Sequence, residues 1–186
     1  NVSTAGTKTI TMTPISNTAA NVDRYANGEG LRAFVASYAA MGANAPTMQL
    51  TYTNSAGTTG RTTTAGIVST ASATSGTILN SGNAANKVGP FLTLAAGDTG
   101  IKDLESLAWG GTAHASGSVF IGLCKPLCMP IPVPATGLYN MVDFVNTLPS
   151  MPRLRNGANI QFLVFGTGAT TAAATLYTNF DYGWGG

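Results

Sequence analysis

The sequence predicts an all-β protein, built as a sandwich or barrel of short antiparallel strands. Two observations lead to this fold class. Short runs rich in Thr, Val, Leu and aromatic residues recur along the chain, and Gly, Pro and Asn separate them. Few apolar residues repeat at the helical period over a useful length, so the chain lacks the alternation of strands and helices that marks an α/β protein.

The first strand candidates stand near the N-terminus and around residue 50. Residues 9–15 (TITMTPI) alternate apolar and Thr positions and stop at Pro14, so they indicate a short strand, and we expect 1–28 to form an extended N-terminal arm or edge strand. Residues 47–54 (TMQLTYTN) alternate Met, Leu and Tyr against Thr and Gln. This alternation predicts a half-buried strand, which ends at a turn over 54–60 (NSAGTTG).

Residues 30–42 (GLRAFVASYAAMG) fit two periods. Their larger apolar residues occur at the spacing of an amphipathic helix: Leu31, Phe34, Val35 and Tyr38. At the period of a strand both faces are partly apolar. We favour the strand, because every neighbouring segment has a strand pattern.

The remaining strands are expected in the second half of a single domain over 29–186. They are Ile101–Trp109, Ser118–Lys125, Leu127–Val133, Leu138–Val145, Asn159–Phe165 and Ala173–Tyr182. Residues 55–89 approach low complexity and hold few large apolar side chains. Such a segment buries too little surface to offset its ordering entropy, so we expect a long loop or an arm that becomes ordered on another chain.

Composition excludes some function classes. Charged residues make up only 9% of the chain and the formal net charge is +2, against roughly 25% charged residues in an ordinary soluble domain. Lys and Arg do not cluster, so the footprint of a nucleic-acid binder is missing. No apolar run reaches the roughly 18 residues of a membrane-spanning helix, and the N-terminus shows no signal-peptide pattern. The weakly charged surface suits a protein that works inside an assembly, and a secreted β-domain is the alternative.

The two cysteines invite a chemical interpretation that their surroundings oppose. Cys124 and Cys128 are separated by three residues that include Pro126. Extended backbone places their Cα atoms about 13 Å apart, whereas a disulfide needs Cα atoms within about 7 Å. A zinc site needs four ligands, and the chain has a single histidine, His114. We interpret both cysteines as small apolar residues of the scaffold, with no metal and no cofactor.

The other candidates for catalysis are weak. His114 stands in a Gly/Ser-rich loop with only Ser116 and Ser118 near it in sequence. The chain contains carboxylates that a glycosidase would need as a pair: Asp98, Asp103, Glu105, Asp143 and Asp181. Asp98, however, belongs to AAGDTG, where Asp-Thr-Gly has the chemistry of a turn. One such tripeptide matches only half of an aspartic protease, and we therefore expect no enzyme and no catalytic residue.

Four segments carry a resemblance to a known family. They are LTYTNSAGTTGRTT (50–63), GPFLTLAAGDTGIKDLESL (89–107), GSVFIGLCKPLCMPIPVP (117–134) and LPSMPRLRNGANIQFLVF (148–165). Over roughly residues 30–165 the chain resembles capsid-associated structural proteins of tailed bacteriophages, nearest the cement or decoration proteins. The resemblance consists of turn and strand signatures and includes no catalytic motif.

The resemblance implies a jelly-roll-like antiparallel β-sandwich with long Gly/Thr/Ala-rich loops. It also implies homotrimers on the outer surface of the virion, in contact with the major capsid protein. Arg61, Arg153 and Arg155 each stand beside a turn, so we expect them to contact a partner. Trp184 lies in an aromatic C-terminal run that is expected to be a last strand, an interface anchor or both. The alternatives are a secreted carbohydrate-binding or adhesive β-domain and another head–tail or tail component.

Overall fold

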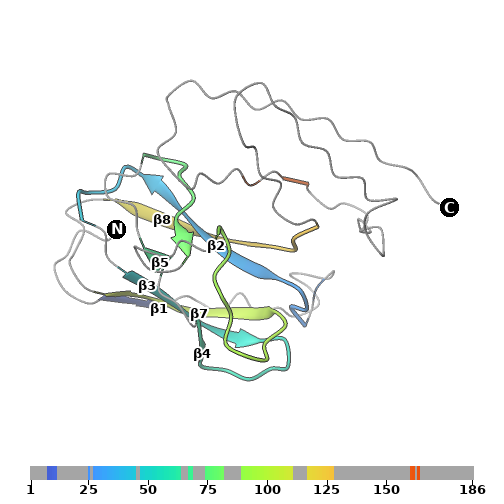
Figure 1. Cartoon of the computed structure of the whole chain (residues 1–186). Helices are drawn as coiled ribbons and strands as arrows, with labels where there is room; N and C mark the ends of the chain where they lie inside the picture. The colour runs from blue at the N-terminus through green and yellow to red at the C-terminus, as the bar shows by residue number, and fades with distance from the viewer. Residues whose placement is uncertain are drawn as a thin grey trace.

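The described part of the chain is made of strands. The computed structural model describes residues 8–11, 25, 27–44, 47–63, 67–68, 74–81, 89–110, 117–127, 160–161 and 163. Within these ranges all regular elements are β-strands and none is a helix (Figure 1). Every strand pair is antiparallel, which confirms the all-β prediction.

The larger sheet is organised around two long strands. β3 (Thr47–Asn54) and β7 (Ile101–Gly110) pair along their lengths in the middle of the sheet. The shorter members are β1 (Lys8–Thr11), β4 (Arg61–Thr62), β5 (Ile67–Val68) and β6 (Asn80–Ser81). The order is β1-β7-β3-β5-β6, and β4 also pairs with β3. The strand predicted over 47–54 is thus confirmed with its exact bounds.

The second sheet pairs β2 (Arg32–Ala39) with β8 (Ser118–Cys124). The ambiguous segment 30–42 is therefore a strand, as its neighbours indicated. On the edge of β2 that faces away from β8, Ala36 bridges to Ile78 and Phe34 bridges to Phe91. Two loop segments thus extend the sheet without forming regular strands.

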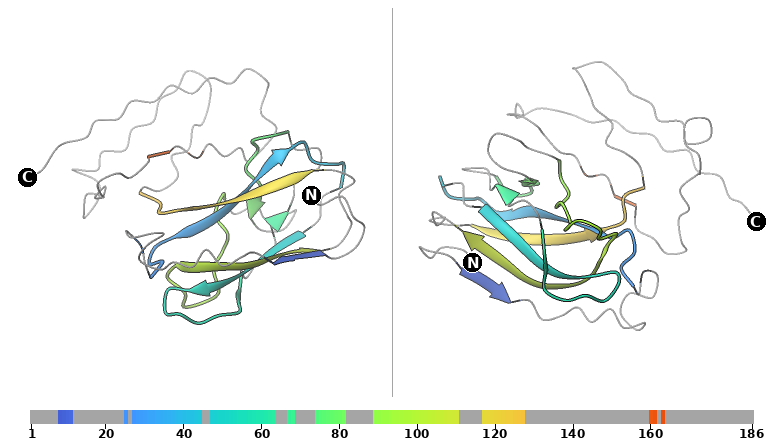
Figure 2. Two further views of the ribbon diagram at one scale, coloured as in Figure 1. Left: turned by 180° about the vertical axis from the view of Figure 1, so that it is seen from behind. Right: turned by 60° about the horizontal axis from the view of Figure 1, so that its bottom comes forward.

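The hydrophobic core lies between the two sheets, which Figure 2 shows as separate layers. Ala33 and Val35 of β2 face Met48, Leu50 and Tyr52 of β3 across this core. All five side chains are almost fully buried. The three apolar residues predicted to line one side of 47–54 are the ones that face the core, because side chains alternate between the faces of a strand.

Two bulges adapt β7 to the core. Its buried residues Ile101, Leu104 and Leu107 are three positions apart, a spacing that a regular strand would turn to opposite faces. The register against β3 shifts twice, so that the ladder skips Lys102 and Glu105, each an extra residue on β7. Each bulge restores the inward direction of the next apolar side chain.

Two glycines allow the chain before β2 to approach the start of β7. Glu29 bridges to Gly100. A Cβ atom at Gly100 would overlap the carbonyl oxygen of Gly28, and one at Gly28 would overlap the carbonyl of Ile101. Gly28 also has a φ of 73°, which favours glycine. No larger residue fits this contact without moving backbone.

The segment 55–89 is described only in part, so its prediction as a long loop or arm stays a prediction. Where the structure describes it, the segment contains β4, β5 and β6 and packs on its own chain. Leu79 and Thr63 are buried, and the Leu79 amide donates to the carbonyl of Val35 (2.8 Å). A few well-placed apolar residues and backbone hydrogen bonds to existing strands hold these described parts on the chain.

Several predicted strands lie outside the described residues. They are Leu138–Val145, Ala173–Tyr182 and, apart from Leu127, Leu127–Val133. Of Asn159–Phe165 the structure describes 160, 161 and 163, and none of these three is in a strand. The jelly-roll connectivity and the domain boundaries therefore stay predictions.

Candidate functional site

The outward face of the β2–β8 sheet is the candidate interaction surface. Val119, Ile121 and Leu123 of β8 pack on the core, so the residues that alternate with them point away from it. Phe120 is 45% exposed, and Tyr38, near the end of β2, is 73% exposed. We call Tyr38 and Phe120, together with the buried ring of Phe34 that contacts Phe120, the aromatic patch.

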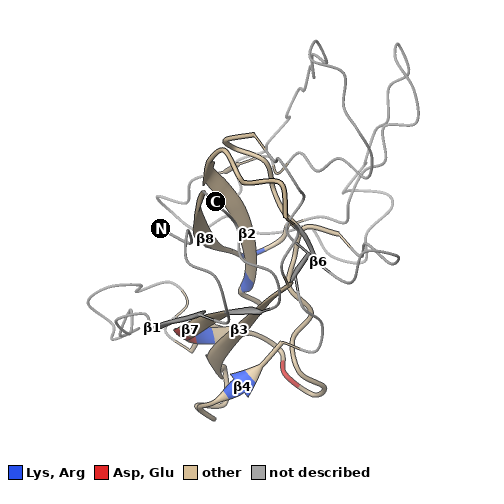
Figure 3. Ribbon diagram, turned by 90° about the vertical axis from the view of Figure 1, so that its left-hand side faces the viewer, with Lys and Arg blue, Asp and Glu red and all other residues tan. Residues whose placement is uncertain are grey.

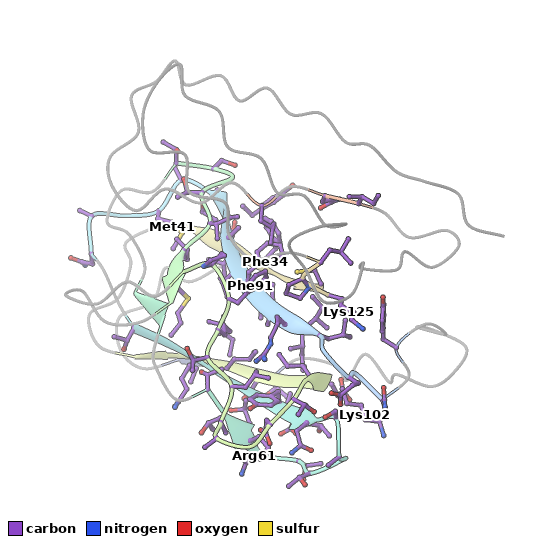
Figure 4. All side chains as sticks on the ribbon, turned by 45° about the vertical axis from the view of Figure 1, so that its right-hand side comes forward. Phe34, Met41, Arg61, Phe91, Lys102 and Lys125 are labelled. Carbon is purple, nitrogen blue, oxygen red and sulfur yellow. The ribbon has the colours of Figure 1, made fainter. Side chains whose placement is uncertain are left out.

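Gly122 leaves the space that the ring of Phe34 occupies. Phe34 pairs with Gly122 of β8, and a Cβ atom at Gly122 would overlap that ring. The ring also meets Phe120 edge to face, with centroids 6.1 Å apart and planes at 82°. Aromatic pairs favour this geometry because the positive ring edge meets the negative ring face. Figure 4 shows Phe34 and Phe91 side by side at β2.

A loop holds the end of β2 that carries Tyr38. The Ser37 hydroxyl donates to the carbonyl of Thr74 (2.5 Å), and the Ser37 amide donates to the carbonyl of Thr77 (2.9 Å). The Ser75 hydroxyl donates to the carbonyl of Tyr38 itself (2.7 Å). The backbone is therefore fixed on both sides of Tyr38, although its side chain is exposed. A fixed backbone lowers the conformational entropy that is lost when a partner covers the side chain.

Charge is nearly missing from this surface. Arg32 is the only charged residue of β2, and β8 has none. In Figure 3 the ribbon of β8, and of β2 beyond Arg32, is accordingly tan. Cys124, the register partner of Arg32, has a free thiol, and burial raises the pKa of that thiol. The thiol is therefore protonated at neutral pH and adds to the apolar character of the face.

A separate polar cluster surrounds Asp98 on the other sheet. The Tyr52 hydroxyl donates to Asp98 Oδ2 (2.6 Å), and Asn54 Nδ2 donates to Oδ1 (2.7 Å). Arg61 Nε forms an ion pair with Oδ2 (2.9 Å), and its Nη2 donates to the carbonyl of Ala96 (3.2 Å). The Asp98 side chain is only 4% exposed. These contacts fasten the 95–99 turn to β3 and β4.

The cluster shifts two pKa values in opposite directions. The hydrogen bonds from Arg61, then Tyr52, then Asn54 lower the pKa of Asp98 to about 2. Burial, followed by the hydrogen bond to Asp98, raises the pKa of Tyr52 to about 12. At neutral pH the carboxylate is ionised and surrounded by donors, and the phenol is neutral. This arrangement suits a structural anchor, because a general acid or base needs a pKa near the working pH.

Of the residues predicted to contact a partner, the structure describes only Arg61. The Arg61 side chain is 34% exposed, forms an ion pair with Asp98 and lies away from Phe34 in Figure 4. Its role as a partner contact stays a prediction. Arg153, Arg155 and Trp184 lie outside the described residues, as do His114 and Cys128. Asp98 is in the predicted turn, since its amide donates to the carbonyl of Ala95 (3.1 Å).

Sequence reasoning missed Tyr38 and Phe120. The available signal was that 30–42, interpreted as a strand, has apolar residues on both faces. One face fills the core, and the second face carries Phe34 and Ala36, which are buried, beside the exposed Phe120 of β8. In the described part of the chain no three His, Cys, Asp or Glu side chains gather as metal ligands, and no helix there is long and apolar enough to cross a membrane.

Comparisons with known proteins do not assign the chain to a family: no family model, no curated protein and no solved structure matches it.

Proposed function

We propose that the chain is a virion structural protein that binds the outer surface of an icosahedral phage head and stabilises the capsid lattice. The observation that carries this proposal is the aromatic patch, in which Tyr38 and Phe120 are exposed and Phe120 packs on the buried ring of Phe34. Exposed apolar surface of this kind marks protein contacts. The low charge of the whole chain and its resemblance to cement proteins support the same function.

The physical basis of the proposed stabilisation is mass action. A protein that binds the assembled lattice, and not the separate subunits, shifts the equilibrium toward the assembled state. Burying one Phe or Tyr side chain contributes about 1.5–3 kcal/mol. One patch alone therefore gives weak binding. Copies joined as homotrimers gain avidity, because the second and third contacts become intramolecular.

The proposed partners are the major capsid protein and other copies of this chain. Neither nucleic acid nor membrane is expected as a partner. The patch would supply the apolar centre of the contact, while Arg153 and Arg155 would supply its polar rim. The jelly-roll-like sandwich belongs to this proposal, since it comes from the resemblance.

A second candidate is a secreted carbohydrate-binding or adhesive β-domain. The exposed rings of Tyr38 and Phe120 favour it, because aromatic rings also stack on sugars. The two candidates differ in their ligand: a sugar platform binds isolated glycans, whereas a cement protein binds only a protein lattice. A glycan-binding screen on the same purified protein separates them.

The proposal is tested by measuring binding to heads of the phage that encodes the chain. We compare the wild type with Tyr38→Ser, Phe120→Ser and, as a control in the exposed 54–60 turn, Thr59→Ala. A loss of about 1.4 kcal/mol weakens binding tenfold, so each patch variant should bind roughly tenfold or more weakly than wild type and control. Equal binding by all four proteins would remove the patch from the contact. Glycan binding without head binding would favour the second candidate.

A further inference from the structure

β1 is an edge strand of the larger sheet. It has four residues, lies at the sheet edge and pairs with β7 alone (Figures 1 and 3). Its register runs from Lys8 opposite Trp109 to Thr11 opposite Ser106. The described side chain of Thr11 is exposed. β1 thus depends on one edge of one strand for its position.

The connection that follows β1 is long. Residues 12–24 separate Thr11 from Tyr25, the next described residue. Fourteen residue steps span up to about 46 Å at roughly 3.3 Å per residue. A folded domain of this length has a radius of gyration of about 16 Å. The connection is therefore long enough for β1 to reach the same edge of a neighbouring copy.

The edge that receives β1 does not distinguish one copy from another. Without β1, β7 would present unpaired backbone groups along Ser106–Trp109, next to the buried Leu107. Such an edge is a template for any extended segment of the right pattern. The same four residues from a second copy would restore the same hydrogen bonds in the same register, so exchange costs little free energy.

We propose that β1 is exchanged between copies: Lys8–Thr11 of one chain pairs with β7 of another and joins the copies into an oligomer. The occupant of the β7 edge is thus a second copy of this chain. This inference goes beyond the proposed function, because it concerns how copies join and holds whether or not they bind a phage head.

The test is disulfide trapping between register partners. In a chain with Cys124→Ala and Cys128→Ala, one protein has Thr11→Cys and a second, longer by a tag, has Ser106→Cys. The two are unfolded, refolded together at micromolar concentration and oxidised. A second pair, Lys8→Cys with Trp109→Cys, samples the other pair type of an antiparallel ladder, because neighbouring pairs alternate between wide and narrow spacing. Circular dichroism checks that each variant is folded.

We expect a disulfide-linked product of one tagged and one untagged chain, in severalfold higher yield than from a control mixture of Thr11→Cys with Thr59→Cys. The control cysteine lies in the exposed 54–60 turn. A single chain with both Thr11→Cys and Ser106→Cys should form covalent multimers. The proposal would be wrong if the double variant formed its disulfide only within one chain and if both mixtures gave no more crosslinked product than the control. A failure of head binding would leave this result unaffected.

Discussion

Replacing Tyr52 by Phe removes one oxygen atom from the centre of the Asp98 cluster and leaves the ring in place. The Tyr52 side chain is fully buried. Its hydroxyl donates to Asp98 Oδ2 (2.6 Å) and accepts from the amide of Ala95 (2.8 Å). The substitution therefore removes two hydrogen bonds at once, one of them to a charged group.

The expected loss of stability depends on which hydrogen bonds of the Asp98 cluster remain in Tyr52→Phe. Asp98 keeps its bonds from Asn54 and Arg61, so its charge is still paired. The part-buried amide of Ala95 loses the Tyr52 acceptor, and a fully buried donor left unsatisfied costs about 1–3 kcal/mol. Together with the lost bond to a carboxylate, we expect the free energy of unfolding to fall by about 2–3 kcal/mol. In a chain of this length that lowers the Tm by roughly 5–10 °C.

Urea unfolding followed by circular dichroism measures this loss. Tyr38→Phe is the matched control, because it removes the same atom from an exposed ring and should change stability by less than about 0.5 kcal/mol. A double-mutant cycle with Asp98→Asn should show coupling between the two positions. If Tyr52→Phe is as stable as Tyr38→Phe, the Asp98 cluster does not anchor the turn and this reasoning is wrong.

Three further predictions concern Asp98, Gly122 and the pair Arg153 and Arg155. Because the folded pKa of Asp98 (about 2) lies below the unfolded value of 3.8, its stabilisation is complete above pH 3.8 and is lost as the pH falls toward 2. Acid unfolding should show the free energies of unfolding of the wild type and Asp98→Asn converging between pH 3.8 and about 2. A difference in stability that stays constant over this pH range would contradict the prediction. Gly122→Ala should destabilise by about 1–3 kcal/mol through overlap with the ring of Phe34. In a Phe34→Leu background, Gly122→Ala should lower the free energy of unfolding by less, as measured by urea unfolding. An unchanged loss of stability would show that the overlap is not with Phe34. Double replacement of Arg153 and Arg155 by Ala should weaken head binding and make the residual binding less sensitive to salt, with an unchanged Tm. Unaltered head binding would remove both arginines from the contact.

The sequence predicted the well-patterned strands because their side chains follow the simple alternation of a half-buried strand. Residues 47–54 show this best, since every second side chain is buried. Residues 101–109 were predicted as a strand, but the two bulges could not be. Bulges depend on the register between two strands distant in sequence, and no local pattern specifies that register. The spacing of Ile101, Leu104 and Leu107 is their only trace in the sequence.

The candidate surface was less predictable than the fold. Tyr38 and Phe120 come from strands about eighty residues apart in the chain, and only the pairing of β2 with β8 puts these strands in one sheet. Arg61 was predicted to face a partner because it stands beside a turn, and the structure pairs it with Asp98 from another loop. Position beside a turn indicates that a side chain can reach outward, but it does not reveal a buried carboxylate within the same chain. Both features depend on contacts between residues distant in sequence, which no local pattern reveals.

The central claim is that the chain binds an assembled head lattice and not its separate subunits. Sedimentation of labelled protein with heads, and in parallel with the same concentration of free major capsid protein, tests this claim most directly. We predict saturable binding to heads, with negligible binding to free subunits, because the contact spans neighbouring subunits. Equal binding to both, or binding to heads no better than that of an unrelated β-domain, would contradict the account.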